Sequence, residues 1–197
     1  VVMRCLECFP DPHRGVIVDC VLGGFDVVVR NSHGCRIIQI CFDLATRKEK
    51  NRMVDLIVKN ANILAKHERA NYAVQHVLKN GSKDDIEAVA KSFRGSYVAL
   101  AKQKFASNVV EVCLRVVTFE TKMKIVNELI DGVKYLLFDQ FANYVVQNAL
   151  AACRDQERAK FVRAIKPYAR RMREDPSGKR ILQKIETTWA EYTDAFQ

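Results

Sequence analysis

Five hexapeptides in the sequence carry polar or planar side chains at fixed positions. Each reads small, variable, variable, apolar, apolar, then Gln or Glu, and successive copies are 36 residues apart. They begin at Gly34, Ala70, Ala106, Ala142 and Gly178. We number the two variable residues and the final residue of each hexapeptide as sites one, two and five of a pentad. On a helix, sites one and five project from the same face because they are four residues apart, and site two lies beside them.

The residue types at these sites suit unpaired nucleic-acid bases. Asn with Gln offers donors and acceptors, which matches the mixed edge of uracil, whereas an ionised Glu only accepts, which matches the two adjacent N–H donors of guanine. Cys with Gln suits adenine less uniquely. Tyr and Arg present planar groups that stack on bases for about 1–3 kcal/mol each. Expected base-edge residues are Cys35, Gln39, Asn71, Gln75, Ser107, Glu111, Asn143 and Gln147, and expected stacking residues are Arg36, Tyr72, Asn108 and Tyr144.

A single Asn-Tyr-x-x-Gln on a helix is usually a solvated face, but its repetition in one row favours binding to single-stranded RNA. The formal net charge of +9 fits an anionic partner, although charge alone fits a merely basic protein equally well. Four further cations are candidates for contacts with the RNA backbone or its 5′ end, with a solvated face as the alternative: Arg170, Arg171, Lys179 and Arg180.

Apolar columns in the same register predict the elements that hold this row. Strings such as Val27-Val28-Val29 look strand-like locally, but the 36-residue step takes precedence over local composition. One column is Leu6, Phe42, Leu78, Leu114 and Leu150. In another part of the repeat, Val89, Phe93 and Leu100 are four and then seven residues apart, which is helical spacing. We expect an all-α fold, a right-handed α-solenoid of three-helix repeats that stack because no unit can bury its apolar face alone.

The register also predicts the domain organisation. We expect a partial N-terminal repeat at residues 1–32, full repeats at 33–68, 69–104, 105–140 and 141–176, and a C-terminal capping half-repeat at 177–197. An apolar stripe in the last segment is expected to cap the final repeat, with a partner-anchoring role for Trp189 as the alternative. The stripe consists of Ile185, Trp189, Tyr192 and Phe196.

Other function classes find little support in the sequence. We expect no enzyme, cofactor or metal site, because no phosphate loop, nucleophile motif or paired ligand set appears. The C-x-x-C pair of Cys5 and Cys8 is expected to pack in a core, and His33 and His67 to pack or cap turns. We also expect no membrane span and no small-molecule substrate. Because the chain begins at Val1 without a signal-like segment, we expect it to be cut from a longer protein.

At the pentads the sequence resembles the PUF (Pumilio-homology) family, whose repeats of about 36 residues read one RNA base each. The resemblance lies in Cys35-Arg36-x-x-Gln39, Asn71-Tyr72-x-x-Gln75, Ser107-Asn108-x-x-Glu111 and Asn143-Tyr144-x-x-Gln147. Family RNA runs antiparallel to the protein, so the repeats would read A, U, G and U and the target would be 5′-UGUA. The order resembles the last four of eight repeats, and Gly178-Lys179-Arg180-Ile181-Leu182 resembles the closing half-repeat.

The resemblance also implies a biological role. It implies binding to 3′ untranslated regions of mRNA in the cytoplasm, and repression of translation or mRNA decay through deadenylase or repressor proteins on the convex face. The partial first repeat departs from the family pattern, because Met3 stands where a polar site-five residue is expected. Two alternatives remain at this point: a PUF-like nucleolar RNA-processing factor with low base specificity, and an α-solenoid protein–protein scaffold.

Overall fold

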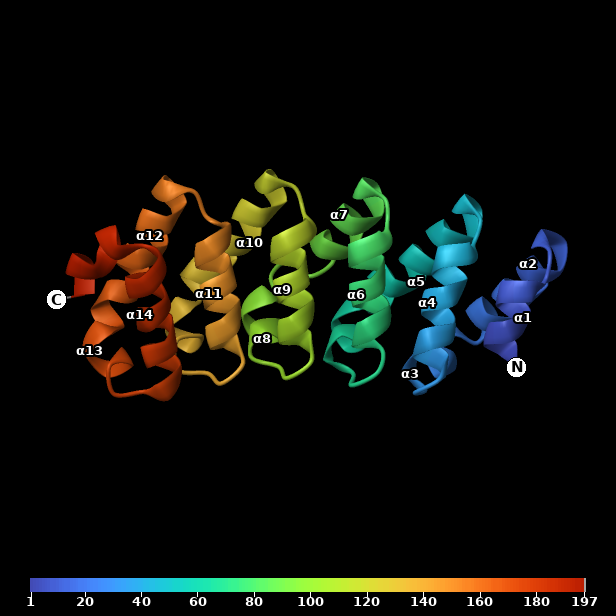
Figure 1. The fold of residues 1–197 in the computed structure, drawn as a ribbon, viewed down its shortest axis with the longest axis horizontal. Helices are drawn as coiled ribbons and strands as arrows, with labels where there is room; N and C mark the ends of the chain where they lie inside the picture. The colour runs from blue at the N-terminus through green and yellow to red at the C-terminus, as the bar shows by residue number, and fades with distance from the viewer. Residues whose placement is uncertain (197) are drawn as a thin grey trace. The chain divides into compact units, whose positions relative to one another are not determined.

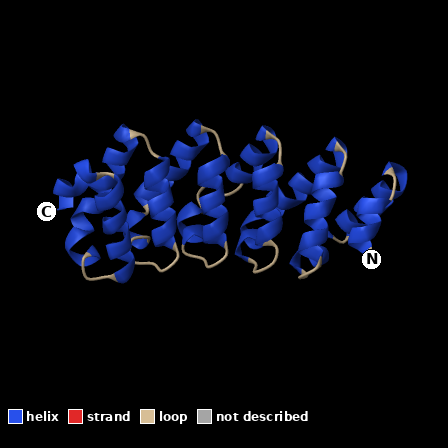
Figure 2. Cartoon of the chain, viewed as in Figure 1, coloured by secondary structure: helices blue, strands red, loops and turns tan. Residues whose placement is uncertain are grey.

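The computed structural model describes residues 1–196, except the side chains of residues 11, 12, 194 and 195, and every regular element in this range is a helix (Figure 2). The chain divides into two compact units, Val1–Phe93 and Arg94–Gln197. Within the described residues, no helix is long and apolar enough to cross a membrane.

The first unit consists of two layers of helices (Figure 1). Its elements are α1 (Val2–Cys8), α2 (Asp11–Gly23), α3 (Phe25–Arg30), α4 (Gly34–Leu44), α5 (Arg47–Lys66), α6 (Asn71–Asn80) and α7 (Lys83–Lys91). Helices α1, α4 and α6 pack side by side, and α2, α5 and α7 form the layer behind them. The short α3 packs against α4.

The second unit repeats this arrangement. Its elements are α8 (Tyr97–Ala101), α9 (Ala106–Val116), α10 (Phe119–Asp131), η1 (Val133–Tyr135), α11 (Ala142–Ala152), α12 (Asp155–Ile165), η2 (Lys166–Tyr168), α13 (Ala169–Met172), α14 (Pro176–Thr188) and η3 (Ala190–Phe196). Helix α11 packs between α9 and α14, while α10 and α12 pack together as the second layer (Figure 1).

The apolar columns form the core of both units, as predicted. Leu6, Leu78 and Leu150 are each 0% exposed, and the other members of their column are equally inaccessible. Burial of a leucine-sized side chain stabilises a fold by about 1.5–3 kcal/mol. The 36-residue repeat therefore specifies which side of each helix faces the stack.

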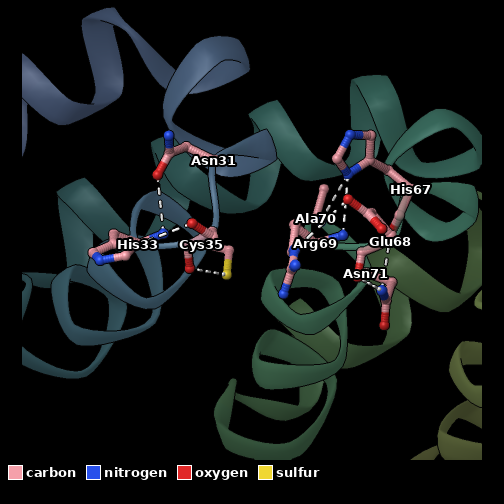
Figure 3. Close-up of polar contacts among 9 residues, drawn as sticks. Asn31, His33, Cys35, His67, Glu68, Arg69, Ala70 and Asn71 are labelled. Atoms are coloured by element: carbon pink, nitrogen blue, oxygen red, sulfur yellow. Dashed lines mark hydrogen bonds and ion pairs between the residues drawn. The ribbon is translucent and has the colours of Figure 1, made fainter.

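Before four of the five hexapeptides, a polar side chain three positions upstream caps the start of the front-layer helix. His67 accepts hydrogen bonds at Nδ1 from the backbone N–H groups of Arg69 and Ala70, at 3.1 and 3.2 Å, as predicted for a capping histidine (Figure 3). Asn31, Asp139 and Asp175 do the same with their side-chain oxygens. These bonds satisfy N–H groups that a helix start leaves without partners. His33 contributes only its backbone N–H to such a cap.

The small first residue of each hexapeptide allows close approach of two backbones. A Cβ on Gly34 would lie 1.9 Å from the carbonyl oxygen of Val28, and one on Gly178 would lie 2.6 Å from the Cα of Met172. The intervening hexapeptides carry alanines that are fully buried. Helices α4 and α14 therefore begin in contact with the short helices α3 and α13, which places their hexapeptides at this contact.

The repeat at residues 33–68 has two helices where the others have three. Helix α5 is continuous for 20 residues, and the positions where other repeats break are occupied by Lys59 and Asn60. The other repeats carry a helix-breaking residue there: Gly24, Gly95, Gly132 or Pro167. Gly95 has a φ of 76°, which favours glycine. Without such a residue the helix continues.

The C-terminal stripe packs against α12, with its latter half in a 3₁₀ helix. Trp189 is only 9% exposed, and the Arg158 guanidinium lies 4.8 Å from its ring centre. The Tyr192 hydroxyl donates to the carbonyl oxygen of Asp155 at 3.2 Å. Trp189 therefore contributes to the cap and is not displayed as an anchor for a partner.

The cysteines fall into two classes. Burial raises the pKa of the Cys41 thiol to about 12 and that of Cys153 to about 11, so both are unreactive packing residues. Cys8 and Cys20 are exposed, and Cys5 is half-buried. The predicted core packing of the C-x-x-C pair is wrong for Cys8, because α1 buries only Leu6. No group of three or more His, Cys, Asp or Glu residues in the described range could hold a metal ion.

Candidate nucleic-acid interface

In four repeats the pentad occupies the start of a front-layer helix, and its sites differ in exposure. Site-one residues are buried, site-five residues are half-buried, and site-two residues are exposed. Tyr72 is 53% exposed and Tyr144 is 48% exposed, although large aromatic side chains are usually buried. Each of these repeats therefore displays one exposed side chain at site two and one half-buried polar side chain at site five.

Asn71 and Gln75 form a connected pair on α6. The Asn71 side-chain amide donates to the carbonyl oxygens of His67 and Glu68, at 2.8 and 2.9 Å (Figure 3). Its Oδ1 accepts from Gln75 Nε2 at 2.9 Å. Asn71 is only 2% exposed. The pair leaves one N–H and the carbonyl oxygen of Gln75 for another partner, a donor beside an acceptor.

Asn143 and Gln147 form an equivalent pair on α11. Asn143 donates to the carbonyl oxygens of Asp139 and Gln140, at 3.2 and 2.9 Å, and accepts from Gln147 Nε2 at 3.3 Å. Asn143 is fully buried. The two Asn-Tyr-x-x-Gln pentads thus have one geometry, in which the asparagine orients the glutamine. Contact of either asparagine with a base stays a prediction.

The pentad on α9 combines two small polar residues at sites one and two with a carboxylate at site five. Ser107 Oγ donates to the carbonyl oxygen of Lys104 at 3.3 Å, and the exposed Asn108 donates to the same oxygen at 3.2 Å. Both contacts tie these side chains to the preceding loop, as in the asparagine pentads. Glu111 is then the one site-five residue that can only accept hydrogen bonds when ionised.

Glu111 lies in a partly desolvated position. Burial raises its pKa above the usual value, while Arg115 on the same helix and a hydrogen bond from Asn148 act in the opposite direction. Asn148 Nδ2 is 2.8 Å from Glu111 Oε2. A carboxylate whose ionised form is disfavoured by burial lowers the stability of the folded chain at neutral pH.

The first full repeat carries a less polar pentad. Cys35 is 7% exposed and its thiol donates to the carbonyl oxygen of Ser32 at 3.3 Å (Figure 3). Arg36 is exposed and Gln39 is half-buried. The polar edge here is a single amide beside a small sulfur surface.

The basic residues near the C-terminus lie on two helices. Lys179 and Arg180 are exposed on α14, and Arg170 and Arg171 are exposed on α13. A groove with a volume of about 230 Å³ lies between α11 and α14. Its lining residues are Tyr144, Gln147, Arg180, Gln183, Lys184 and Thr187. Arg180 therefore adjoins the polar row, whereas the Arg171 guanidinium lies 3.9 Å from the ring centre of Phe138.

Sequence reasoning missed Asn148, Gln183 and Lys184. Gln183 occupies site five of the last hexapeptide, so the register could have identified it as part of the row. Asn148 and Lys184 follow site five by one residue, outside the pentad, and only the packing of adjacent helices brings them to it.

In each unit, stacked helical repeats with polar pentads at the starts of the front-layer helices define an α-solenoid repeat protein. A family model described as the Pumilio-family RNA binding repeat matches residues 4–22, 29–58, 60–91, 96–130 and 136–166. The chain belongs to the Pumilio (PUF) family.

Individual relatives agree with this assignment. A Pumilio domain-containing protein of Schizosaccharomyces pombe is 36% identical over 94% of this chain and 28% of its own length. The crystal structure of PUF-8 in complex with PBE-RNA is 26% identical, with a TM-score of 0.86 over 100% of this chain and 58% of that one. A Puf4 domain bound to an HO endonuclease RNA 3′ UTR recognition sequence has a TM-score of 0.89 at 23% identity, over 99% of this chain and 62% of that one. The all-α solenoid prediction is confirmed.

The similarity has a defined extent. The chain spans between 28% and 36% of the lengths of the first curated relatives that it matches. The family model and the RNA-bound structures support RNA binding.

Proposed function

We propose that this chain binds single-stranded RNA one base per repeat and prefers 5′-UGUA, with its C-terminal repeat toward the RNA 5′ end. The observation that carries the proposal is the geometry of the row. Two identical asparagine–glutamine pairs present a donor beside an acceptor, and Glu111 stands between them in chain order.

Each side chain has a definite role in this proposal. Gln75 and Gln147 pair with the mixed edge of uracil, and ionised Glu111 accepts from N1–H and N2–H₂ of guanine. Cys35 and Gln39 accommodate adenine. The exposed site-two side chains, above all Tyr72 and Tyr144, stack on the bases.

The test is a competition measurement of Kd with short RNAs that contain UGUA or single-base variants of it. The wild-type chain is expected to bind UGUA most tightly. Glu111→Gln should weaken the binding free energy for UGUA by about 1–3 kcal/mol and relax the preference for G, because one of the two acceptor oxygens is replaced by an NH₂ donor. The matched control is Glu120→Gln, an exposed residue on α10. If the Glu111→Gln variant still strongly prefers G, the assignment of Glu111 is wrong.

The proposal extends to a biological role. We infer binding to 3′ untranslated regions in the cytoplasm and repression of translation or mRNA decay through deadenylase or repressor proteins. The related Puf4 structure holds a 3′ UTR sequence. Crosslinking in cells, followed by sequencing of bound RNA, tests this role. Equal binding of all RNAs would favour a low-specificity nucleolar factor, and absence of RNA binding would favour a protein–protein scaffold.

A further inference from the structure

Asn148 lies on α11, directly after the pentad that ends at Gln147, and contacts the preceding front-layer helix. Its Nδ2 donates to Glu111 Oε2 on α9 at 2.8 Å and to the backbone carbonyl oxygen of Tyr144 at 3.0 Å. An amide nitrogen carries two hydrogens, so both are engaged. The bond to its own helix holds the amide while the second N–H points at the carboxylate. Helices α9 and α11 pack side by side (Figure 1).

The residue type at this position is specific to the repeat. The residues at the same register of the five hexapeptide helices are Ile40, His76, Val112, Asn148 and Lys184. His76 contacts the preceding helix too, but its Nε2 lies 2.7 Å from Oδ1 of Asp43 and not against a site-five residue. The single amide in this column thus meets the single carboxylate of the site-five row.

We infer that Asn148 is a positioning residue for guanine: it orients the Glu111 carboxylate, so that the repeat which reads U also determines how strictly its neighbour reads G. The inference rests on the proposed RNA-reading function. It extends that function because the base preference of one repeat then depends on a side chain of the next.

The chemistry allows Asn148 and a guanine to bind the carboxylate together. An ionised carboxylate has about four acceptor positions, so one bond from Asn148 leaves enough for two N–H donors of a base. A donor fixed before the RNA arrives removes rotamer freedom that Glu111 would otherwise lose on binding. It also favours the ionised form, which a half-buried carboxylate would otherwise resist.

Few other groups act on this carboxylate. Arg115 on the same helix is the charged group that does, while α8 and α11, both packed against α9, contain no Lys, Arg, Asp or Glu. Among the described residues, no charged side chain of α10 shifts the pKa of Glu111. Asn148 is therefore the side chain of the neighbouring repeat that favours the ionised form of Glu111 by a hydrogen bond.

The first test compares Kd values for RNAs containing UGUA and UAUA at pH 7.5. Asn148→Ala should reduce the preference for G by about fivefold or more, the effect of losing one hydrogen bond to a charged group, and leave the preference at both U positions unchanged. Asn148→His introduces the residue found at the equivalent position, His76, and keeps an N–H donor. This variant should therefore retain part of the preference for G. The matched control is Asn127→Ala, which removes a cross-repeat hydrogen bond to Lys160 on the other layer.

A pH series separates positioning from a structural role. As pH is lowered, the preference for G should disappear at a higher pH in Asn148→Ala than in the wild-type chain. The reason is that Glu111 has lost a hydrogen-bond donor that favours its ionised form. Equal weakening toward every RNA, or full G preference in a folded Asn148→Ala variant, would overturn the inference. A wild-type chain without any G preference would contradict the proposed function instead, so the two failures are distinguishable.

Discussion

At the scale of single residues, the half-buried carboxylate of Glu111 places binding and stability in opposition. Burial raises its pKa, so the folded chain binds a proton there more readily than the unfolded chain does. A carboxyl group with a raised pKa contributes to the free energy of unfolding in its protonated form. This contribution is fully present below the pKa of the unfolded state and is lost as pH rises through the pKa of the folded state. At neutral pH the charge is therefore a cost that the fold carries.

Glu111→Gln should raise the midpoint temperature of thermal unfolding at pH 7. The gain in the free energy of unfolding should be less than about 1 kcal/mol, because the group is only half-buried. The gain should vanish below about pH 4, where the wild-type carboxyl is also neutral. Thermal melts across this pH range measure it, with Glu120→Gln as the exposed control. A variant that is less stable than the wild-type chain at pH 7 would show that the hydrogen bond from Asn148 outweighs desolvation.

Asp85 shows the opposite case on the layer behind the row. Burial would raise its pKa, but hydrogen bonds from Arg47 and Ser82 outweigh burial and lower it. Its two oxygens lie 2.7 and 2.9 Å from the Arg47 guanidinium, which joins α5 to α7, and one of them also accepts from the backbone N–H of Ser82. A depressed carboxyl pKa contributes stability above the unfolded-state value.

At the scale of elements, Asp85→Asn should therefore weaken the junction between α5 and α7. We expect a loss of about 1–2 kcal/mol at pH 7, discounted for the solvent exposure of Arg47. The difference should shrink as pH falls below about 4, because the wild-type carboxyl then becomes protonated as well. Thermal unfolding followed by circular dichroism measures it. The control, Asp84→Asn, changes an exposed neighbour on the same helix, and an equal loss in both variants would contradict a specific role.

The elements were largely predictable from the sequence, and the departures have physical causes. A 36-residue register fixed the buried columns and the starts of the front-layer helices. It did not show that α5 continues through the position where the other repeats interrupt this helix. The helix continues because Lys59 and Asn60 stand where the other repeats have Gly or Pro. The exposure of Cys8 was also missed, because the seven-residue helix α1 buries only Leu6.

The helical positions of the pentad residues were predictable from the sequence, but their hydrogen bonds were not. Spacing identified the eight site-one and site-five residues. Spacing could not show that Asn71 and Asn143 direct their amides into the preceding loop, since that depends on how the loop carbonyls approach the helix start. The contact of Asn148 with Glu111 was beyond reach for the same reason: it depends on the packing of α11 against α9.

At the scale of the whole molecule, the net charge of +9 bears on RNA binding of any sequence. Cations near a single strand release counterions, so binding weakens as salt rises, with a slope of about 0.7 per neutralised phosphate. Arg180 and Lys184 are the cations that line the groove beside Tyr144 and Gln147.

Arg180→Ala should weaken binding to all RNAs alike and reduce the salt slope by about 0.7, without changing the preference for UGUA. Titrations of labelled RNA at several salt concentrations measure the slope. Arg163→Ala removes the same charge from α12, outside the row, and should leave the slope nearly unchanged. Equal slopes for all three proteins would assign Arg180 to the solvated surface.

The bonding of site one has a consequence for how base preference could change in evolution or by engineering. Asn71 and Asn143 serve the start of their helices as well as the row, so replacing them disturbs folding together with recognition. Among the described residues, Gln39 and three of the exposed site-two side chains make no such bond, whereas the fourth, Asn108, donates to the carbonyl oxygen of Lys104. A mutational route to a new target sequence is therefore least obstructed where it begins at sites two and five and reaches site one last.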